Sequence, residues 1–475
     1  MALYLTKMRL IVFGSAAGLI VLSIVFFALG LGRDRVQPVR DVSLEFWGIF
    51  QNRDLMDGLA RSYMKTHQNV TIEYKGFGDS EFTDYEPMIV KTLAEGDGPD
   101  IFFINNTWLP RHLGKLVPAP SDFSSLSAAA VRRDFVDVVA DDFVVKDPET
   151  GVEATYGAPL SLDTLALFYN KEMFNSASIA SPPATWTEFQ EVVQKLAVKD
   201  SAGNVLRAGA AIGTANNILR STDILSLLMI QNGTKMVDDN HSRVEFSNNV
   251  GSVRPGPAAL AFYVQFASPS SPYYTWNRRM HFSVDAFYER QAVMMFGYAY
   301  NIDTIRKKAP YLDFGIAPVP QISVAAGADA FSYANYWSPV VTKKTLPGEY
   351  KNLGCTSGSV RPPIAASPCW YAWDFIMSML LDAPAQEYLE TTQRPAAQRH
   401  LIEWQRDTMP GQRLAIFATQ GIFAKSWYQP DSSKVEQFMA AAIDAVQLRN
   451  VTVDEALKDA ADQINALLAK QRGGL

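Results

Sequence analysis

Hydrophobic and polar residues alternate where the globular part of the chain begins. In "VSLEFWGIF" (42–50), apolar positions alternate with others at the two-residue period of a strand. Residues 55–64 then repeat apolar side chains at four-residue spacing, which indicates a helix. A second alternating run (70–74) and a second helical stretch (about 84–95) precede the apolar run "IFFI" (101–104). This strand–helix–strand–helix–strand order predicts an α/β fold with a parallel sheet.

The same periodicities continue further along the chain. In "PPATWTEFQEVVQKL", Thr185 can cap a helix and Glu188 stands at the capping-box position. "TDILSLLMIQNG" is typical of a helix that stops at an Asn-Gly pair. "QAVMMFGY", "LDFGIAPVP" and "NYWSPVVTK" are typical of buried strands. Residues 434–470 predict two amphipathic helices, the second capped by Thr452 with Glu455.

A long uncharged segment lies near the N-terminus. From Leu10 to Gly32 the chain carries no charged side chain, which is long enough for a helix that spans a bilayer. We therefore expect a cytoplasmic N-terminus (1–9), a transmembrane anchor (10–32) and a tether (33–41), with the globular part on the extracytoplasmic side of the cell membrane. A cleaved signal peptide is the alternative, although the apolar run exceeds the usual core of such a peptide.

Composition and charge exclude several classes of function. With 475 residues, of which 48% are hydrophobic, the chain can bury large cores and should form two or more domains. A net charge of −6 without a basic stripe offers no surface for nucleic acid. The five histidines are scattered, and no zinc, GxSxG, Walker A or GxGxxG motif occurs. We therefore predict no metal, no cofactor and no enzymatic activity.

The two cysteines lie close together in "CTSGSVRPPIAASPC". Cys355 and Cys369 could close this loop as a disulfide, or they could stay as two free thiols. A local pair in a Pro- and Ser-rich loop fits an oxidising exterior.

Polar and aromatic residues gather where the predicted strands end. They are Trp47, then Asn106, Thr107 and Trp108, then Asp163, then Tyr298, and finally Asn335, Tyr336 and Trp337. Taken singly, each has an ordinary structural interpretation as a core residue, a turn or a cap. Taken together, they indicate a ligand site, because ligands of open α/β sheets bind outside the carboxyl ends of the strands. Aromatic faces beside amides, hydroxyls and a carboxylate suit a neutral, polyhydroxylated ligand.

These residues and their order resemble a known family. "AEGDGPDIFFINNTWL", "LSLDTLALFYNKEMF" followed by "PPATWTEF", and "YERQAVMMFGYAYNIDTI" leading into "FGIAPVP" are similar to segments of the extracellular solute-binding proteins of ABC importers, in particular the carbohydrate-binding group that includes the maltodextrin-binding proteins. The resemblance covers roughly residues 42–470.

The resemblance implies a two-lobed periplasmic-binding-protein-like fold (type II), in which each lobe is a mostly parallel sheet flanked by helices. Chain crossings are expected near 158–163, 331–335 and 394–397. Lobe 1 would comprise 42–160 and 334–394, and lobe 2 would comprise 161–333 and 395–475.

The resemblance also implies which residues bind the ligand in the cleft between the lobes. Carried over by position, they are Trp47, Asn106, Thr107, Trp108, Asp163, Tyr298, Asn335, Trp337 and Arg394. Thr107 and Trp108 stand where the maltodextrin-binding relatives have an Asp-Arg pair, and Ile104 stands where they have a tryptophan, so we expect a neutral saccharide other than maltodextrin.

The function expected from the sequence is capture of a sugar or oligosaccharide by a monomeric protein and its delivery to an ABC transporter permease. Alternatives are a non-sugar solute such as a polyamine, a peptide or a metal chelate, and a membrane-anchored sensor without transport. A glycan-processing enzyme would need two carboxylates across the cleft, and the sequence offers only Asp163.

Overall fold

The computed structural model describes residues 41–325, 327–346, 355, 367–408, 412–449 and 451–473. The predicted N-terminus (1–9), the predicted anchor (10–32) and nearly all of the predicted tether lie outside the described residues. Within the part that is described, no helix combines the length and the apolar character that crossing a membrane requires.

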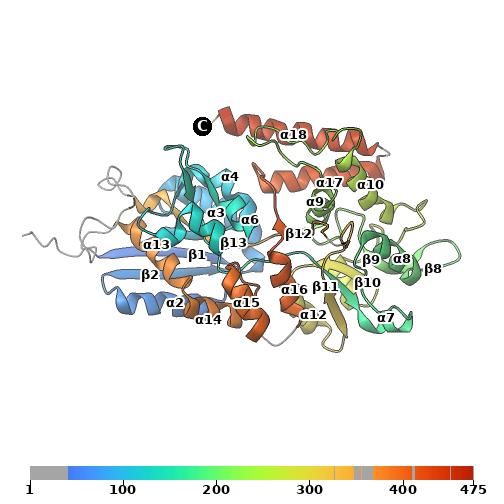
Figure 1. Cartoon of the computed structure of the whole chain (residues 1–475), viewed down its shortest axis with the longest axis horizontal. Helices are drawn as coiled ribbons and strands as arrows, with labels where there is room; N and C mark the ends of the chain where they lie inside the picture. The colour runs from blue at the N-terminus through green and yellow to red at the C-terminus, as the bar shows by residue number, and fades with distance from the viewer. Residues whose placement is uncertain are drawn as a thin grey trace, which may run out of the picture.

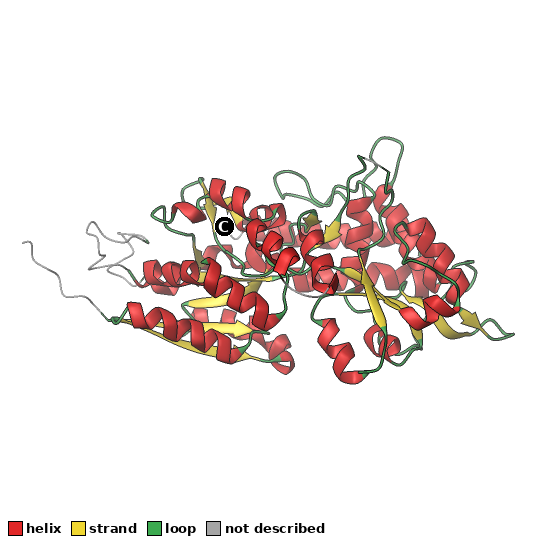
Figure 2. Ribbon diagram, turned by 60° about the horizontal axis from the view of Figure 1, so that its bottom comes forward, coloured by secondary structure: helices red, strands yellow, loops and turns green. Residues whose placement is uncertain are grey.

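The chain forms two lobes, each built on a five-stranded sheet with helices packed against it (Figures 1 and 2). The first sheet has the order β2-β1-β3-β13-β4. Its strands are β1 (Val42–Ile49), β2 (Val70–Phe77), β3 (Ile101–Asn105), β4 (Leu116–Val117) and β13 (Trp337–Thr342). The second sheet has the order β11-β7-β10-β9-β8. Its strands are β7 (Ala166–Asn170), β8 (Val198–Lys199), β9 (Val205–Ala211), β10 (Ala292–Gly297) and β11 (Phe314–Ala317).

Both sheets are mixed, which corrects the prediction of mostly parallel sheets. In the first sheet β1 runs parallel to β2 and β3, but β13 is antiparallel to β3 and β4. In the second sheet only β9 and β10 pair in parallel, and β7 is antiparallel to both its neighbours. The path of the chain explains part of this, since β7 and β13 enter a lobe directly from a crossing and run against their neighbours. The short strand β8 adds a further antiparallel pair, with β9.

Helices surround the two sheets. The helices of the first lobe are α2 (Arg53–Thr66), α3 (Phe82–Glu95), α4 (Leu109–His112), α5 (Ala128–Asp134), α6 (Asp137–Phe143), α13 (Pro368–Met379), α14 (Asp382–Thr392) and α15 (Arg399–Thr408), with the small hairpin β5 (Val144–Lys146) and β6 (Glu153–Thr155). The helices of the second lobe are α7 (Lys171–Ser176), α8 (Trp186–Leu196), α9 (Ser221–Gln231), α10 (Pro255–Val264), α11 (Ser283–Tyr288), α12 (Asn301–Lys308), α16 (Gln412–Gly421), α17 (Ser432–Leu448) and α18 (Val453–Gly473).

The local signals for helix starts are confirmed. The Thr185 hydroxyl accepts a hydrogen bond from the N–H of Glu188, at 3.2 Å, at the start of α8. Thr452 and Glu455 form the reciprocal capping box at the start of α18, with N···O distances of 3.2 and 3.1 Å. Each cap satisfies backbone N–H groups that have no partner inside the helix.

The three expected crossings lie side by side at the hinge. Ser161 forms a β-bridge with Ala396, and Thr164 forms another with Ala334. Close by, β12 (Ser332–Tyr333) pairs in parallel with β14 (Ala424–Lys425). A second link lies away from the crossings, where the end of α18 reaches α4 of the first lobe and Gln471 donates to the Pro110 carbonyl at 2.6 Å (Figure 1).

Each lobe has its own apolar core. The core of the first lobe also includes Leu401 and Ile402 of α15, beyond the expected boundary at residue 394. The core of the second lobe includes much of α17 and α18. The structure joins Cys355 to Cys369, at the start of α13, by a disulfide bond.

Candidate ligand-binding cleft

A cleft of about 1270 Å³ lies between the lobes. Its walls come from both lobes, and its floor includes residues of all three crossings, among them Asp163, Asn335 and Arg394. A site of this kind forms only after folding, because its lining residues come from segments hundreds of positions apart in the sequence.

The wall of the first lobe is aromatic. Phe50, Phe82, Trp108 and Trp337 all line the cleft. The Trp337 ring has its centroid 5.0 Å from that of Trp108 and 5.5 Å from that of Phe50, both in edge-to-face contact. Phe82 lies 5.5 Å from Phe50 and is 42% exposed. Aromatic rings held by one another in this way lose little freedom when a ligand packs on them.

Arg394 holds part of this wall in place. Phe50 follows β1 with a positive φ of 58°, which is uncommon for a residue with a large side chain. The Arg394 guanidinium donates to the Phe50 carbonyl, to the Gln51 side chain at 3.1 Å and to the Tyr388 hydroxyl at 2.9 Å. Three hydrogen bonds from one planar group explain how the loop keeps a conformation that is otherwise unfavourable.

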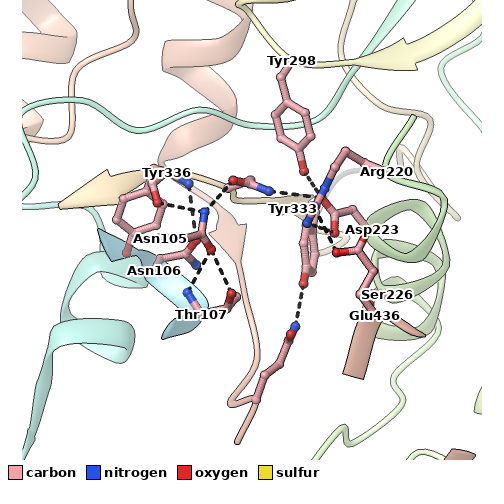
Figure 3. A network of polar contacts seen from close by, with 12 residues as sticks. Asn105, Asn106, Thr107, Arg220, Asp223, Ser226, Tyr298, Tyr333, Tyr336 and Glu436 are labelled. Carbon is pink, nitrogen blue, oxygen red and sulfur yellow. Dashed lines mark hydrogen bonds and ion pairs between the residues drawn. The ribbon is translucent and has the colours of Figure 1, made fainter. Parts of the chain in front are cut away.

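The wall of the second lobe combines a tyrosine with charged side chains. Tyr300 is 53% exposed, and its ring stacks at 6.1 Å on the buried ring of Tyr298. Arg220 binds Asp223 through two parallel contacts, Nε–Oδ2 at 2.8 Å and Nη2–Oδ1 at 2.9 Å. Glu436 of α17 also lines the cleft and approaches Arg220 at 3.3 Å (Figure 3). This wall therefore offers both hydrogen-bond donors and acceptors.

Asp163 lies at the hinge between these walls. Its carboxylate accepts hydrogen bonds from the N–H of Thr164, at 2.8 Å, and of Ala299, at 3.1 and 3.0 Å. Burial raises the pKa of Asp163 to about 7, and these N–H donors offset only part of that effect. Near neutral pH this side chain can therefore either accept or donate a hydrogen bond.

A chain of amides links the two walls across the hinge (Figure 3). Asn105, at the end of β3, donates to the Asn335 side chain at 2.9 Å. Asn335 in turn faces Asp223 of the second lobe at 3.4 Å, and its backbone N–H donates to the Asp163 carbonyl at 3.0 Å. Asn335, in the second crossing, therefore contacts the first crossing and both lobes.

The sequence also matches a known family. The family described as bacterial extracellular solute-binding protein matches residues 48–347, which is more than half of the chain. The chain belongs to this family. The resemblance inferred from the sequence is thereby confirmed, and the family is one of solute-binding proteins rather than of enzymes.

Two relatives of this solute-binding protein match it only over part of their length. The maltotriose-binding protein of Pyrococcus abyssi is 24% identical over 157 residues, which are 31% of this chain and 29% of that protein. A binding protein of Brucella abortus is 26% identical over 104 residues, 22% of this chain and 23% of the relative. The chain thus matches less than a third of the length of these curated relatives.

Solved structures share the fold over most of the chain. The sugar-binding protein MalE from Xanthomonas citri has a TM-score of 0.68 at 17% identity and covers 90% of this chain and 98% of its own. The cyclic α-maltosyl-1,6-maltose-binding protein of Arthrobacter globiformis has a TM-score of 0.65 at 18% identity, with coverages of 90% and 99%. The solute-binding protein therefore has the two-lobed periplasmic-binding-protein fold.

Six of the nine expected ligand-binding residues line the cleft. They are Thr107, Trp108, Asp163, Asn335, Trp337 and Arg394. Within the described residues, no group of three or more His, Cys, Asp or Glu side chains could hold a metal ion.

Trp47 does not line the cleft, and neither does Tyr298. Strand β1 continues to Ile49, so Trp47 lies inside the strand, packed on Phe77 at 5.5 Å, with the Lys75 ammonium 4.6 Å from its ring. Phe50 takes the place at the strand end that was expected for Trp47. Tyr298 is buried beneath the exposed ring of Tyr300, and its hydroxyl donates to Asp223 at 2.6 Å.

Asn106 is likewise buried away from the cleft. Its amide donates to Asp142 at 3.0 Å, and its oxygen accepts from the Tyr336 N–H at 3.3 Å. Asp142 also accepts from the hydroxyls of Tyr336 and Ser426. Burial raises the pKa of Asp142 to about 6 despite these donors. Asn106 therefore belongs to a buried polar network beside the hinge.

Reasoning from the sequence missed many residues of the cleft, among them Phe50, Phe82, Arg220, Tyr300 and Glu436. Phe50 and Tyr300 lie two or three positions from predicted residues, so a correct strand end would have found them. No sequence pattern indicated Arg220 or Glu436, because the two are 216 positions apart and become neighbours only in the folded lobe.

Proposed function

We propose that this solute-binding protein captures a neutral sugar or oligosaccharide by closing its lobes around it and delivers it to an ABC importer. The observation that carries the proposal is one cleft in which aromatic faces of the first lobe oppose the hydrogen-bonding groups of the second. Sugar rings present apolar C–H faces and polar hydroxyls at once, and this pair of walls suits both. Two solved relatives are themselves described as sugar- or maltosyl-maltose-binding proteins.

Within this proposal five residues of the cleft have roles. Trp108, Trp337 and Tyr300 provide faces for the sugar rings, while Thr107 and Asp163 hydrogen-bond to hydroxyls. Stacking contacts and neutral hydrogen bonds contribute on the order of 1 kcal/mol each. A micromolar complex requires roughly 8 kcal/mol after the costs of binding, so contacts with other residues of the cleft must add to these five.

Lobe closure follows from the position of the ligand. A sugar that contacts both walls binds the closed arrangement more tightly than the open one, so it shifts the population towards closure. The three adjacent crossings are the elements about which the lobes would rotate.

A thermal-shift screen against neutral mono- and oligosaccharides tests the proposal. A saccharide that binds only the folded protein raises the melting temperature, by an amount that grows with its concentration. The proposal is overturned if no saccharide raises the melting temperature while a polyamine or a peptide does.

We also infer that segment 10–32 anchors the protein in the cell membrane, with the lobes on the extracytoplasmic side. The segment carries no charged side chain and is long enough to span a bilayer, which supports the anchor. Family membership supports the extracytoplasmic position of the lobes. Fractionation of cells should leave the protein in the carbonate-washed membrane pellet, whereas a soluble product shortened at its N-terminus would indicate a cleaved signal peptide.

A further inference from the structure

Arg220 stands at the edge of the cleft in an unusual conformation. It precedes α9 with φ 52° and ψ 43°, in the left-handed region that disfavours residues other than glycine. Asp223, whose side chain is only 5% exposed, grips the guanidinium through two parallel hydrogen bonds. Asp223 is itself held by the Tyr298 hydroxyl at 2.6 Å. The arginine side chain is therefore fixed in one position rather than free to move.

Glu436 completes the arrangement from a distant segment. Its side chain is 48% exposed on the cleft side of α17, and its Oε2 lies 3.3 Å from Nη1 of Arg220. Its other oxygen, Oε1, has no hydrogen-bond partner in the described part of the chain. Three guanidinium N–H bonds point at the two carboxylates, which leaves two for a ligand.

The charges of this group do not cancel. One guanidinium faces two carboxylates, so the group carries a net charge of −1 where it meets the cleft. Four other cations line the cleft. Arg394 is committed to the Phe50 carbonyl, and Lys171 pairs with Asp313 at 3.7 Å. Arg306 and Lys307 lie at exposed positions on α12, where solvent and salt screen them. A ligand anion that approached Arg220 would have to lie beside Glu436.

We propose that Arg220 and Glu436 form a specificity pair that binds adjacent hydroxyls of an uncharged saccharide and rejects saccharides that carry a carboxylate. A hydroxyl can accept from the guanidinium while its neighbour donates to Oε1 of Glu436, whereas a carboxylate can only accept. This inference rests on the proposed function, because it assumes that a saccharide occupies the cleft.

The variant Glu436→Gln tests the pair, because it keeps the shape of the side chain and removes its charge. Affinities are measured by calorimetry on the full chain, with neutral disaccharides of glucose, mannose and galactose and with the matching disaccharides that contain a uronic acid. We expect wild type to bind a neutral member at least tenfold more tightly than its uronic counterpart. In the variant, the affinity for the neutral sugar should fall about tenfold, the size typical of losing a charge-assisted hydrogen bond, and the preference should nearly disappear.

Asp444→Asn is the matched control. Asp444 lies on the same helix and pairs with Arg278 at 2.7 Å outside the cleft, so its replacement should leave both affinities unchanged. Glu436→Ala is a second variant, which should show the same loss of preference if the amide of the first creates a new contact. A preference retained in both Glu436 variants overturns this inference alone, as does a wild type that prefers the uronic sugar. Failure of every saccharide to bind wild type overturns the proposed function and this inference with it.

Discussion

Replacing the hinge carboxylate with an amide should change how the stability of the protein depends on pH. Asp163 has its pKa raised by burial from 3.8 to about 7. Between these two values the folded state holds a proton that the unfolded state has released. Wild type therefore loses stability as the pH rises through this window, and the loss is complete above about pH 7. The variant Asp163→Asn has no such proton to lose.

The magnitude follows from the size of the shift. One pKa unit corresponds to about 1.4 kcal/mol, so charging Asp163 in the folded state costs at most about 4 kcal/mol. Between pH 5 and pH 8 the stability of the variant should therefore rise relative to wild type by at most about 3 kcal/mol, and by roughly half of that once solvent in the cleft is allowed for. The amide can keep accepting from Thr164 and Ala299 through its one oxygen, so the fold should survive the change.

Urea unfolding at pH 5 and at pH 8, followed by tryptophan fluorescence, measures this difference. Asp142, with its pKa near 6, titrates in the same window, but it is present in both proteins and its contribution cancels. Parallel stability profiles of wild type and variant over this range would refute the reasoning, since they would mean that Asp163 is already ionised in the folded protein at pH 5.

Three further predictions concern the cleft and the disulfide. Trp337→Ala should weaken binding of a neutral saccharide at least tenfold in calorimetry, whereas Trp47→Ala should lower stability with a much smaller effect on affinity. Tyr300→Ala should also weaken binding, and Tyr300→Phe should restore most of it, because the ring face provides the contact; equal losses in both variants would assign the effect to the hydroxyl. Replacing Cys355 and Cys369 with serine should lower the free energy of unfolding by about 3 kcal/mol in chemical denaturation. Neither cysteine lines the cleft, so affinity should stay unchanged, and a change in affinity would contradict this prediction.

Local elements of this protein could be predicted from the sequence because their signals are local. A helix such as α2 buries Leu55, Leu59 and Tyr63 at four-residue spacing, and α8 and α18 begin at caps whose partners lie three residues away. The segments that resemble the family also predicted the two lobes, the hinge and six of the residues that line the cleft. These inferences needed only the periodicity of the chain or an ordered set of short motifs.

The direction of side chains at the strand ends could not be predicted in the same way. Trp47 and Asn106 were assigned to the cleft because they follow or end a strand. However, β1 continues two residues past Trp47, to Ile49, so a different residue stands at the strand end. Asn106 instead meets Asp142, which no sequence pattern links to it. The end of β10 shows a similar effect, because Tyr298 is buried whereas Tyr300 faces the cleft.

The sequence by itself therefore determined many of the helices and strands and the family, because periodicity, caps and motifs act over a few residues. Only the tertiary structure decided that both sheets are mixed, that Phe50 and Tyr300 face the cleft, and that Arg220 meets Glu436. These features depend on where three chain crossings bring distant segments together, and the contacts that result are set by packing in three dimensions rather than by neighbours along the chain.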